Sequence, residues 1–363
     1  MVVEPTKATQ VHLQDILRTA IRLQASDVHL VPGHPITYRV HGRFERTQEA
    51  ALSAIEAQSI LEAVLPPRLR VHLGDRKDFD CSVCMENGGG PCRFRANLFQ
   101  SAGQWCACLR HIPEEIPSFE WMGFPDGLAQ RLIAHRNGLV IITGVTGSGK
   151  STTLAALVHL LNAKGDTRVI TVEEPVEYVH RPMSTSVVTQ REVGRDVDSF
   201  FEGLKYGLRQ DPDVILVGEI RDRDTAQMAL SAAETGHLIL TTMHTKDAKG
   251  AVTRFVDLFP YDVQDDIRTQ IALSLRSVVC QHLLPSKQPG QKRALALEVL
   301  HVNQPVRSAI RVGKIDSIES AIQTGKRDGM ITLDEELVRL LQTGRISVDI
   351  ARRFAKDGDA FPG

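Results

Sequence analysis

The sequence predicts an α/β fold of two domains, in which a small α+β domain precedes a larger domain built on a mostly parallel sheet. Three observations lead to this prediction. The length of 363 residues is more than twice that of a typical domain of about 150 residues. The first third of the chain contains strand-like segments and two amphipathic stretches, whereas strands and helices alternate after residue 126. A glycine-rich loop of the kind that binds phosphate lies near the start of this second region.

The composition is that of a globular protein with a substantial core. Hydrophobic residues make up 42% of the chain and charged residues 24%, with 43 basic against 44 acidic side chains. This composition excludes a wholly disordered chain and argues against a general affinity for nucleic acid. The longest apolar runs are far shorter than the roughly 18 residues that cross a bilayer. The N-terminus lacks a secretory signal pattern, so we expect a cytoplasmic protein with reduced cysteines.

The first domain is predicted over residues 1–111. Its predicted elements are a helix over 11–23, strands over 28–31 and 36–40, a helix beginning at Ser53, and a meander over 78–110. Apolar residues of the first segment follow the 3.6-residue period of an amphipathic helix. Glu56 lies three residues after Ser53 and completes a capping box, which marks the start of the second helix. Apolar and polar residues alternate in the meander, as they do in half-buried strands.

A linker is predicted over residues 112–125, because Pro113, Pro117 and Pro125 argue against regular structure there. The second domain is predicted over residues 126–363. Its predicted strands cover 139–143, 169–172, 214–217, 238–242 and 294–299. Helical stretches separate these strands, and this alternation predicts a mostly parallel sheet.

The C-terminal tail is predicted to be helical. Thr332 and Glu335 form a second capping box, which marks the start of a helix. Gly344 has the position of a residue that ends this helix in a left-handed conformation.

The strongest functional signal is a complete phosphate-binding loop, Gly144-Val-Thr-Gly-Ser-Gly-Lys-Ser151, between an apolar strand and a helical stretch. Its glycines let backbone N–H groups close around phosphate oxygens. Lys150 places a charge near the β- and γ-phosphates, and the Ser151 hydroxyl can ligate Mg²⁺. The sequence therefore predicts that the chain binds ATP and Mg²⁺. The predicted nucleotide-binding residues are Gly144, Thr146, Gly147, Ser148, Gly149, Lys150, Ser151 and Thr152.

Carboxylates follow two of the predicted parallel strands. One apolar run leads into Glu219, which suits a Mg²⁺ ion held through water, although Asp is the usual residue. Glu173, Glu174 and Glu177 follow another strand, and one of them can accept a proton from the attacking water. We therefore expect Ser151 and Glu219 to serve the metal, and this glutamate group to supply a general base.

Two histidines, His237 and His244, bracket the predicted strand 238–242. They lie about 20 Å apart on an extended strand, so they cannot share a metal ion. The spacing leaves a phosphate-sensing role at the strand end open, and both histidines are candidate catalytic residues.

The cysteines offer a zinc site as an alternative function. The candidates are Cys81, Cys84, Cys92, Cys106 and Cys108. A second C-x-x-C pair is absent, and most of these cysteines fall in strand-like alternation, where a thiol packs as a small apolar group. We therefore expect structural cysteines and no bound zinc.

Several linked motifs resemble those of the secretion-type motor ATPases. They are the phosphate-binding loop, Thr171-Val-Glu-Glu-Pro-Val-Glu177, Leu208-Arg-Gln-Asp-Pro-Asp213, Val217-Gly-Glu-Ile-Arg-Asp222 and Ala233-Glu-Thr-Gly-His237 through His244. Their order and spacing match the Walker A motif, the Asp box, the atypical Walker B motif and the His box of that superfamily. Within it, the chain resembles the type IV pilus retraction ATPases of the PilT type. This resemblance extends from Ala25-Ser-Asp-Val-His-Leu30 to Ile322-Gln-Thr-Gly325.

The resemblance implies a PAS-like N-terminal α+β domain followed by a RecA-like P-loop ATPase domain with a helical C-terminal tail. It implies that Glu177 is the general base, and that Glu219 and Ser151 serve the metal and water. It also implies that Arg95 and Arg110 of the first domain complete the site in a ring of six subunits.

The resemblance assigns one further motif, and the sequence departs from the family pattern at two positions. The resemblance places His237 and His244 in the His box. Gly103 stands where family members often carry an additional arginine, and Glu174 stands where Asp is usual. The first departure removes one expected arginine contact, and the second lengthens a side chain near the water shell of the metal.

The implied function is a hexameric motor that hydrolyses ATP to power type IV pilus retraction by pilin disassembly, and so twitching motility. The implied partners are further copies of the chain and a platform protein of the inner membrane, with membrane association only through partners and no nucleic acid. The implied location is the cytoplasm, at the inner-membrane face of the pilus machine.

Two alternatives remain. The first is a pilus extension or type II secretion ATPase, which usually carries a four-cysteine zinc insertion, whereas Gly236 to Leu300 contains only Cys280. The second is an accessory retraction subunit with low turnover, which the two departures favour. A nucleic-acid translocase is disfavoured by the net charge of -1.

Overall fold

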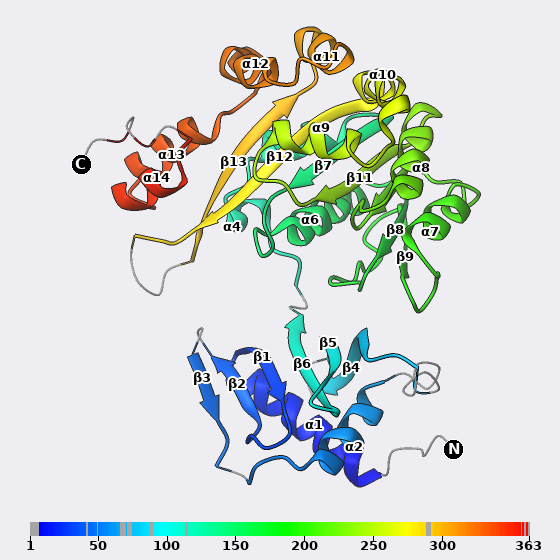
Figure 1. Ribbon diagram of the computed structural model, residues 1–363, viewed down its shortest axis with the longest axis vertical. Coiled ribbons are helices and arrows are strands. Elements are labelled where there is room, and N and C mark those ends of the chain that lie inside the picture. The colour runs from blue at the N-terminus through cyan, green and yellow to red at the C-terminus, as the bar shows by residue number, and fades with distance from the viewer. Residues whose placement is uncertain are drawn as a thin grey trace. The chain divides into compact units, whose positions relative to one another are not determined.

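The computed structural model forms two compact units. It describes residues 7–40, 43–48, 50–65, 70, 75–87, 90–112, 115–287, 292–356, 358 and 361. The first unit consists of Met1–Glu115 and Pro175–Val179, and the second of Ile116–Glu174 and His180–Gly363 (Figure 1). The α/β class and the order of the two folds along the chain are therefore as the sequence predicts. Pro113 of the predicted linker lies outside the described residues.

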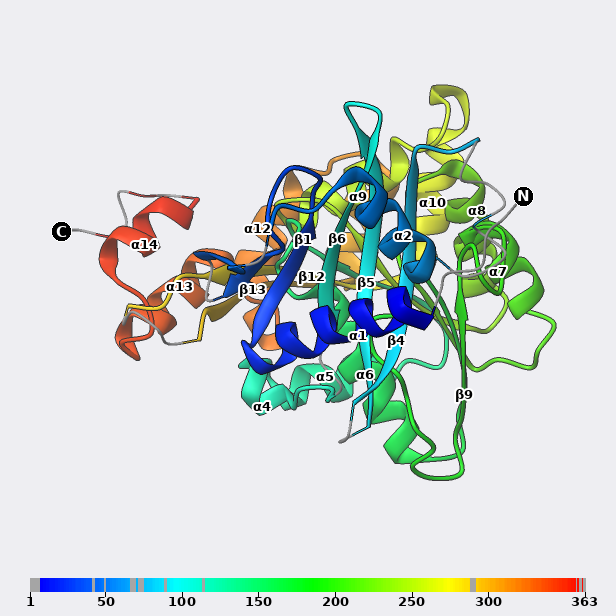
Figure 2. The ribbon, with the colours of Figure 1, turned by 90° about the horizontal axis from the view of Figure 1, so that it is seen from below.

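The first unit is a six-stranded antiparallel sheet with the order β3-β2-β1-β6-β5-β4. Its strands are β1 (Ala25–Leu30), β2 (Thr37–Val40), β3 (Arg43–Arg46), β4 (Asp78–Asn87), β5 (Gly90–Ser101) and β6 (Gln104–Ile112). Two helices, α1 (Lys7–Arg22) and α2 (Ala54–Val64), lie on one face of this sheet (Figure 2). Both helices form in the regions that the sequence predicts, although α1 begins at Lys7 and ends at Arg22 instead of covering 11–23. Ser53 and Glu56 form the expected capping box. The apolar residues of the sheet's helix-covered face build the core.

The second unit is a seven-stranded sheet with the order β13-β12-β7-β11-β10-β8-β9. Its strands are β7 (Gly138–Thr143), β8 (Arg168–Glu173), β9 (Val187–Glu192), β10 (Val214–Val217), β11 (Leu238–Met243), β12 (Leu275–Leu284) and β13 (Ala294–His301). All neighbours pair in parallel except β12 and β13, which are antiparallel. The predicted mostly parallel sheet is thus confirmed.

Helices cover both faces of this second sheet. They are α4 (Phe119–Met122), α5 (Asp126–Ile133), α6 (Lys150–Lys164), α7 (Phe200–Gly207), α8 (Arg223–Glu234), α9 (Ala248–Val256), α10 (Gln264–Ser274), α11 (Gln304–Arg311) and α12 (Ser317–Thr324), with the 3₁₀ turns η1 (Tyr261–Val263) and η2 (Gly325–Asp328). Leu139 and Ile141 of β7 face the cluster that contains α8 to α12, whereas Val140 and Ile142 face α5 and α6. Strand residues therefore alternate between two apolar layers, as a doubly covered parallel sheet requires.

Three features of the fold differ from the sequence prediction. Strands β3, β9 and β12 were not predicted, and β13 is antiparallel to its neighbour. The predicted linker contains regular structure, because α4 forms within it. Ser118 accepts a hydrogen bond from the Trp121 amide and starts that helix, and Gly123, at φ 76°, ends it.

The C-terminal helices pack on the ends of β12 and β13 that extend beyond the parallel strands (Figure 1). These helices are α13 (Leu333–Gln342) and α14 (Val348–Phe354). The capping box of Thr332 and Glu335 is present as predicted, and Gly344 has a φ of 67°. Leu337 and Leu340 of α13 contact Leu284 and Ala296 of the two strands in one buried cluster. The tail therefore belongs to the second unit.

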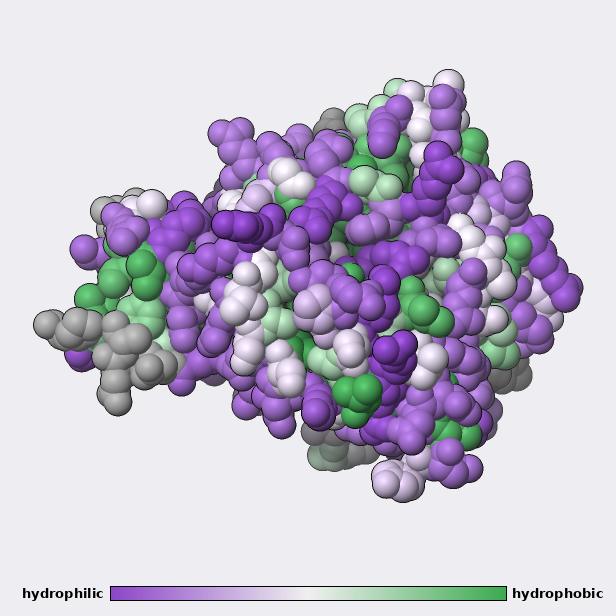
Figure 3. All heavy atoms as spheres, turned by 90° about the horizontal axis from the view of Figure 1, so that it is seen from above, coloured by the Kyte–Doolittle hydropathy of each residue, from purple (hydrophilic) through white to green (hydrophobic). Residues whose placement is uncertain are grey.

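In the face seen in Figure 3, hydrophobic areas are separated by hydrophilic ones. Scattered exposed apolar residues of this kind are normal in globular proteins. Across the described part of the chain, no helix combines the length and the apolar character that a membrane span requires.

Gly203 allows α7 to lie directly on β8. A Cβ atom at this position would lie 2.5 Å from Cγ1 of Val172. We predict that Gly203→Ala lowers the stability of the second unit by about 1–3 kcal/mol, because a packed core resists an added methyl group. A lower midpoint of thermal unfolding would measure this loss.

Gly127→Ala in α5 is the matched control. A Cβ atom at Gly127 would meet no atom within 4 Å, so this change should leave the midpoint unchanged or raise it slightly. Equal unfolding midpoints for the two variants would contradict the close packing of α7 on β8.

Candidate nucleotide-binding site

The phosphate-binding loop connects β7 to α6, as its motif predicts. Gly144, Gly147 and Gly149 have φ values of 144°, 78° and 92°, which side chains rarely adopt. The buried Lys150 begins α6, and its Nζ donates hydrogen bonds to the carbonyl oxygens of Gly144 (2.9 Å) and Val145 (3.1 Å). The loop thus encloses its own lysine at the N-terminal end of a helix, where backbone N–H groups and the helix dipole favour an anion.

Strand β12 holds the loop from the side. A Cβ atom at Gly144 would lie 2.5 Å from the backbone oxygen of Gln281 and 2.5 Å from Oγ of Ser148. The Gln281 amide also donates from Nε2 to Oγ1 of Thr153 in α6 (2.8 Å). Gln281 therefore supports both the loop and the helix that follows it. The sequence analysis missed this residue because it missed β12.

The carboxylates at the strand ends lie at the same edge of the sheet as the loop. Strands β7, β8, β10 and β11 are parallel and pair in register, so their C-terminal ends meet there. Glu173 ends β8, and its Oε1 accepts hydrogen bonds from Thr171 (2.6 Å) and Gln190 (3.2 Å). Thr242 of β11 fixes the turn that precedes Glu219, because its hydroxyl donates to the backbone oxygen of Gly218 (2.6 Å).

Glu219 is a largely enclosed carboxylate at this edge of the sheet. Only 12% of its side chain is exposed, and it forms an ion pair with Arg221. His244 Nε2 lies 3.5 Å from Oε2 of Glu219, an oxygen that accepts no hydrogen bond. Arg221 also lies 3.7 Å from the exposed Glu174. Sequence reasoning missed Arg221, although it occurs in the Walker B-like motif.

His244 lies near the lysine and the carboxylate of this site. Burial and the charge of Lys150 lower the pKa of His244 below its usual value, against an opposing effect of Glu219. The next residues are fixed to β7, because the Thr245 amide donates to Oγ1 of Thr143 (3.0 Å), next to Gly144. The structure thus brings Lys150, Glu219 and His244 together.

His237 lies at the opposite edge of the same sheet. It precedes β11, and its carbonyl oxygen accepts a hydrogen bond from the Gly138 amide at the start of β7 (3.0 Å). Its Nδ1 lies 3.1 Å from the Ala232 oxygen at the end of α8. The six residues of β11 separate His237 from the phosphate-binding end by about 20 Å. Within one subunit, the structure therefore corrects the expectation that His237 joins the site.

The two arginines of the first unit are neighbours on the sheet face that the helices leave uncovered. Arg95 of β5 lies directly opposite Arg110 of β6, and Arg110 lies opposite Asp27 of β1. Arg110 Nε donates to Asp27 Oδ1 (2.8 Å), whereas Arg95 Nε lies 3.5 Å from Oδ1 of Asp80. The hydrogen bond to Asp27 is the main cause that raises the pKa of Arg110. Asp27 is buried and holds Arg110 in place.

Glu177 lies in the segment Pro175–Val179, which groups with the first unit. Its side chain is half-buried. The charge of Glu177 contributes to the raised pKa of Arg110, after the larger effects of Asp27. Glu177 therefore acts electrostatically on one of the two predicted arginines.

The donor atoms fit a magnesium ion better than a zinc ion. Ser151 at the start of α6 and Glu219 offer hydroxyl and carboxylate oxygens, the ligand type that Mg²⁺ prefers, and Oε2 of Glu219 lacks a hydrogen-bond donor. The thiols of Cys81, Cys92 and Cys106 are buried in the first unit. Within the described ranges, no group of three or more His, Cys, Asp or Glu residues has the arrangement of a metal site.

The fold and the loop together define a P-loop ATPase. Residues 5–356 match the type II/IV secretion system protein family, and the chain belongs to this family. The chain is an ATPase of that family, with a nucleotide-binding P-loop.

Two relatives and one solved structure show what the chain is similar to within that family. The chain is 38% identical to the uncharacterized protein YggR of Escherichia coli, over 92% of this chain and 100% of YggR. It is also 38% identical to the type IV pilus retraction ATPase PilT of Pseudomonas aeruginosa, over 96% of this chain and 99% of PilT. The crystal structure of the pilus retraction motor PilT with bound ADP matches with a TM-score of 0.85 and 37% identity, and covers 95% of this chain and 97% of PilT.

The close approach of Gly144 to β12 leads to a prediction about nucleotide binding. We predict that Gly144→Ala weakens binding of ADP and ATP more than tenfold, because the added methyl group displaces the loop from Gln281. Titration with a fluorescent nucleotide measures the affinity.

Gly344→Ala is the matched control, since Gly344 also has a positive φ of 67° but has open space around it. It should bind nucleotide normally. Equal affinities for Gly144→Ala and the unmodified protein would show that the loop tolerates the added group.

Proposed function

We propose that this ATPase is a motor that powers type IV pilus retraction, by pilin disassembly, and so twitching motility. The observation that carries the proposal is the end-to-end similarity to PilT, at 38% identity over 96% of this chain and 99% of PilT. Pilus extension or type II secretion is less favoured, because Cys280 is the only cysteine between Gly236 and Leu300.

In the proposed reaction, water attacks the γ-phosphate of ATP held by the phosphate-binding loop. Lys150 and the backbone N–H groups of the loop offset the charge of the phosphates. Glu177 orients the water and accepts its proton. His244, just after β11 and 3.5 Å from Glu219, senses the γ-phosphate. A Mg²⁺ ion, when bound by Ser151 and through water by Glu219, supplies further charge stabilisation.

We propose that the working form is a ring of six subunits. In this ring, Arg95 and Arg110 would contribute positive charge to a nucleotide, as arginines supplied across an interface do in other phosphoryl-transfer enzymes. The paired position of the two arginines on one sheet face supports this role. The further proposed partner is a platform protein of the inner membrane. The proposed location is the cytoplasmic face of that membrane, with no nucleic acid bound.

A second candidate is an accessory retraction subunit with low turnover. Gly103 takes the place of an expected arginine in the turn between β5 and β6, where Ala102 and Gly103 have φ values of 50° and 75°. Successive positive φ values are those of a tight hairpin turn that favours glycine. This chain therefore retains a tight turn in place of a third arginine contact, and the rate of turnover distinguishes the two candidates.

The proposed roles of two carboxylates are tested by isosteric changes. We predict that Glu177→Gln and Glu219→Gln bind ATP normally but lower kcat by orders of magnitude, because each removes only one charge from the reacting water or the metal. Nucleotide titration and steady-state phosphate release measure the two effects.

Glu202→Gln is the control, since Glu202 lies in the first turn of α7 and pairs with Lys205. It should hydrolyse ATP at the normal rate. If Glu177→Gln keeps normal turnover, the role of general base passes to Glu173 or Glu174.

The direction of force is tested in the source cell. We predict that deletion of the gene leaves cells with excess surface pili and no surface motility, because pili are assembled but not withdrawn. Electron microscopy of pili and a motility assay measure both traits. Cells without pili would instead assign the protein to pilus extension, and unchanged cells would remove it from both processes.

A further inference from the structure

A buried carboxylate outside the nucleotide site anchors the helix that follows His244. Only 2% of the Glu298 side chain is exposed, at the middle of β13. Its Oε1 accepts a hydrogen bond from the amide of Ala248, the first residue of α9 (2.7 Å). A carboxylate at this position meets the positive end of the helix dipole and satisfies a free N–H group of its first turn.

The N-terminus of α9 is directly connected to the nucleotide site. Only three residues, Thr245 to Asp247, lie between His244 and Ala248. Asp247 caps α9 through the Gly250 amide (2.5 Å), and the Thr245 hydroxyl donates to the Asp247 carbonyl oxygen (2.9 Å). This segment is therefore held at one end by Thr143 of β7 and at the other by Glu298.

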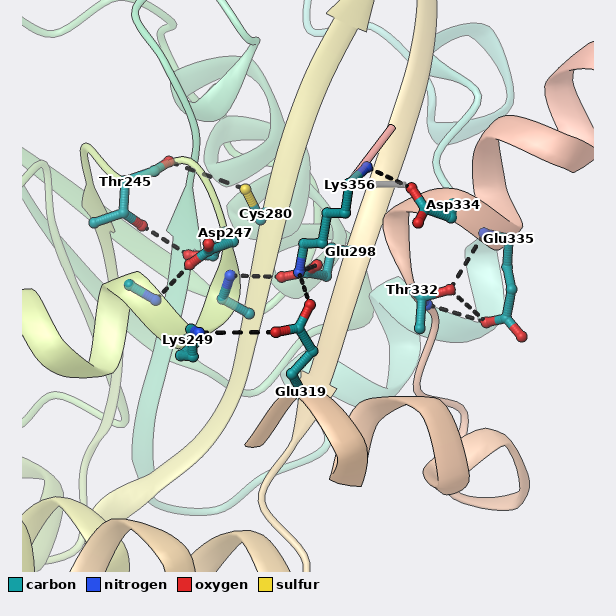
Figure 4. Close-up of polar contacts among 12 residues, drawn as sticks. Thr245, Asp247, Lys249, Cys280, Glu298, Glu319, Thr332, Asp334, Glu335 and Lys356 are labelled. Carbon is teal, nitrogen blue, oxygen red and sulfur yellow. Dashed lines mark hydrogen bonds and ion pairs between the residues drawn. The ribbon is translucent and has the colours of Figure 1, made fainter. Parts of the chain in front are cut away.

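Lys356, just beyond α14, supplies the charge that Glu298 needs. Its Nζ lies 2.7 Å from Oε2 of Glu298 and 3.3 Å from Oε1 of Glu319 in α12 (Figure 4). Burial works to lower the pKa of Lys356, but the hydrogen bond and charge of Glu298, with Glu319, raise it overall. The Lys356 amide donates to Oδ1 of Asp334 in α13 (2.9 Å), so the backbone of this lysine is fixed by the tail itself.

The second lysine of this cluster is a weaker partner. Lys249 of α9 lies 3.1 Å from Asp316 and 3.7 Å from Glu319. The Asp316 side chain is fully exposed, and exposed ion pairs contribute little. By contrast, a buried carboxylate that loses its cation becomes an uncompensated charge. Lys356 is therefore the cation on which the Glu298 anchor depends.

We propose that Lys356 is a positioning residue for ATP hydrolysis: by pairing with Glu298 it fixes the start of α9, and through it the His244 to Asp247 segment, beside the phosphate-binding loop. The proposal rests on the proposed role of His244 at the γ-phosphate. It makes the C-terminal tail part of the catalytic apparatus, although the tail packs on the extensions of β12 and β13 beyond the parallel strands. Displacement of the tail by a partner would then slow hydrolysis without touching the nucleotide.

The test compares Lys356→Met with the unmodified full-length protein. We expect kcat to fall on the order of tenfold, which corresponds to about 1.4 kcal/mol of transition-state stabilisation. We expect the affinity for ADP to change less than about twofold, because the loop that binds the diphosphate keeps its contacts. Hydrogen exchange of the 244–250 peptide should become faster, and Lys356→Arg should restore kcat.

Lys326→Met is the matched control, because Lys326 forms an ion pair with Glu335 in the same tail but has no contact with α9 among its described contacts. It should keep the normal kcat. The proposal is overturned if Lys356→Met has a normal kcat, if kcat and ADP affinity fall together, or if Lys326→Met loses as much activity.

Two further variants keep the test decisive. If Lys356→Met does not fold, the double variant Glu298→Gln with Lys356→Met removes both charges and avoids an unpaired buried carboxylate. Its amide oxygen makes a weaker hydrogen bond to Ala248, so kcat should still fall several-fold, and a normal kcat would overturn the proposal. His244→Ala separates the proposed role of His244 at the γ-phosphate from the proposed positioning role of Lys356. Normal turnover in His244→Ala refutes the role of His244 itself. Lost turnover in His244→Ala, together with normal turnover in Lys356→Met, refutes only the role of the tail.

Discussion

The parallel pairing of β7 with β11 and β12 is the constraint on which the nucleotide site depends. It places the end of β7 between two strands, so the phosphate-binding loop leaves the sheet against the backbone of Gln281. Only a glycine fits at Gly144, and the same contact fixes the path of the loop over Lys150. The neighbouring strand ends then carry Glu219 and His244 to the same edge. A local loop motif thus becomes a site only because long-range strand pairing surrounds it.

Features of this site that depend on residues close together in the sequence could be predicted, whereas features that depend on distant residues could not. The loop, both capping boxes and the strand before Glu219 were predicted because neighbouring residues determine them. Strand β12 was missed because it follows α10 without a turn and is buried on both faces, which removes the alternation that marks a strand. Gln281 and its support of the loop were lost with it. His237 was placed in the site by its motif, whereas the direction of β11 carries it to the other edge.

In the first unit, too, contacts between residues distant in the sequence could not be predicted. The alternation of apolar and polar residues in β5 and β6 predicted strands. Every second residue of a strand points to the same side of a sheet, so Arg95 and Arg110, which pair across β5 and β6, share one face. The partner of Arg110 is Asp27, which lies 83 residues away in the sequence and is brought close by the pairing of β1 with β6. No local pattern contains that pairing. A pre-positioned arginine keeps fewer conformations to lose when an anion binds, so Asp27 prepares Arg110 for the role proposed for it.

The pair formed by the buried Glu298 and the partly exposed Lys356 illustrates why a charged contact can matter more for position than for stability. Taking the Glu298 carboxylate out of water costs about as much as its attraction to Lys356 returns, so two well-packed apolar side chains would hold the tail equally well. An apolar residue at Glu298, however, would leave the Ala248 amide without an acceptor at the buried start of α9. The acceptor at that point, together with the Asp247 cap, sets the direction of the helix that continues from His244, and a cation makes a buried carboxylate tolerable there. The placement of a lysine on the tail therefore ties the geometry of the nucleotide site to a segment that is remote from the phosphate-binding loop in the sequence.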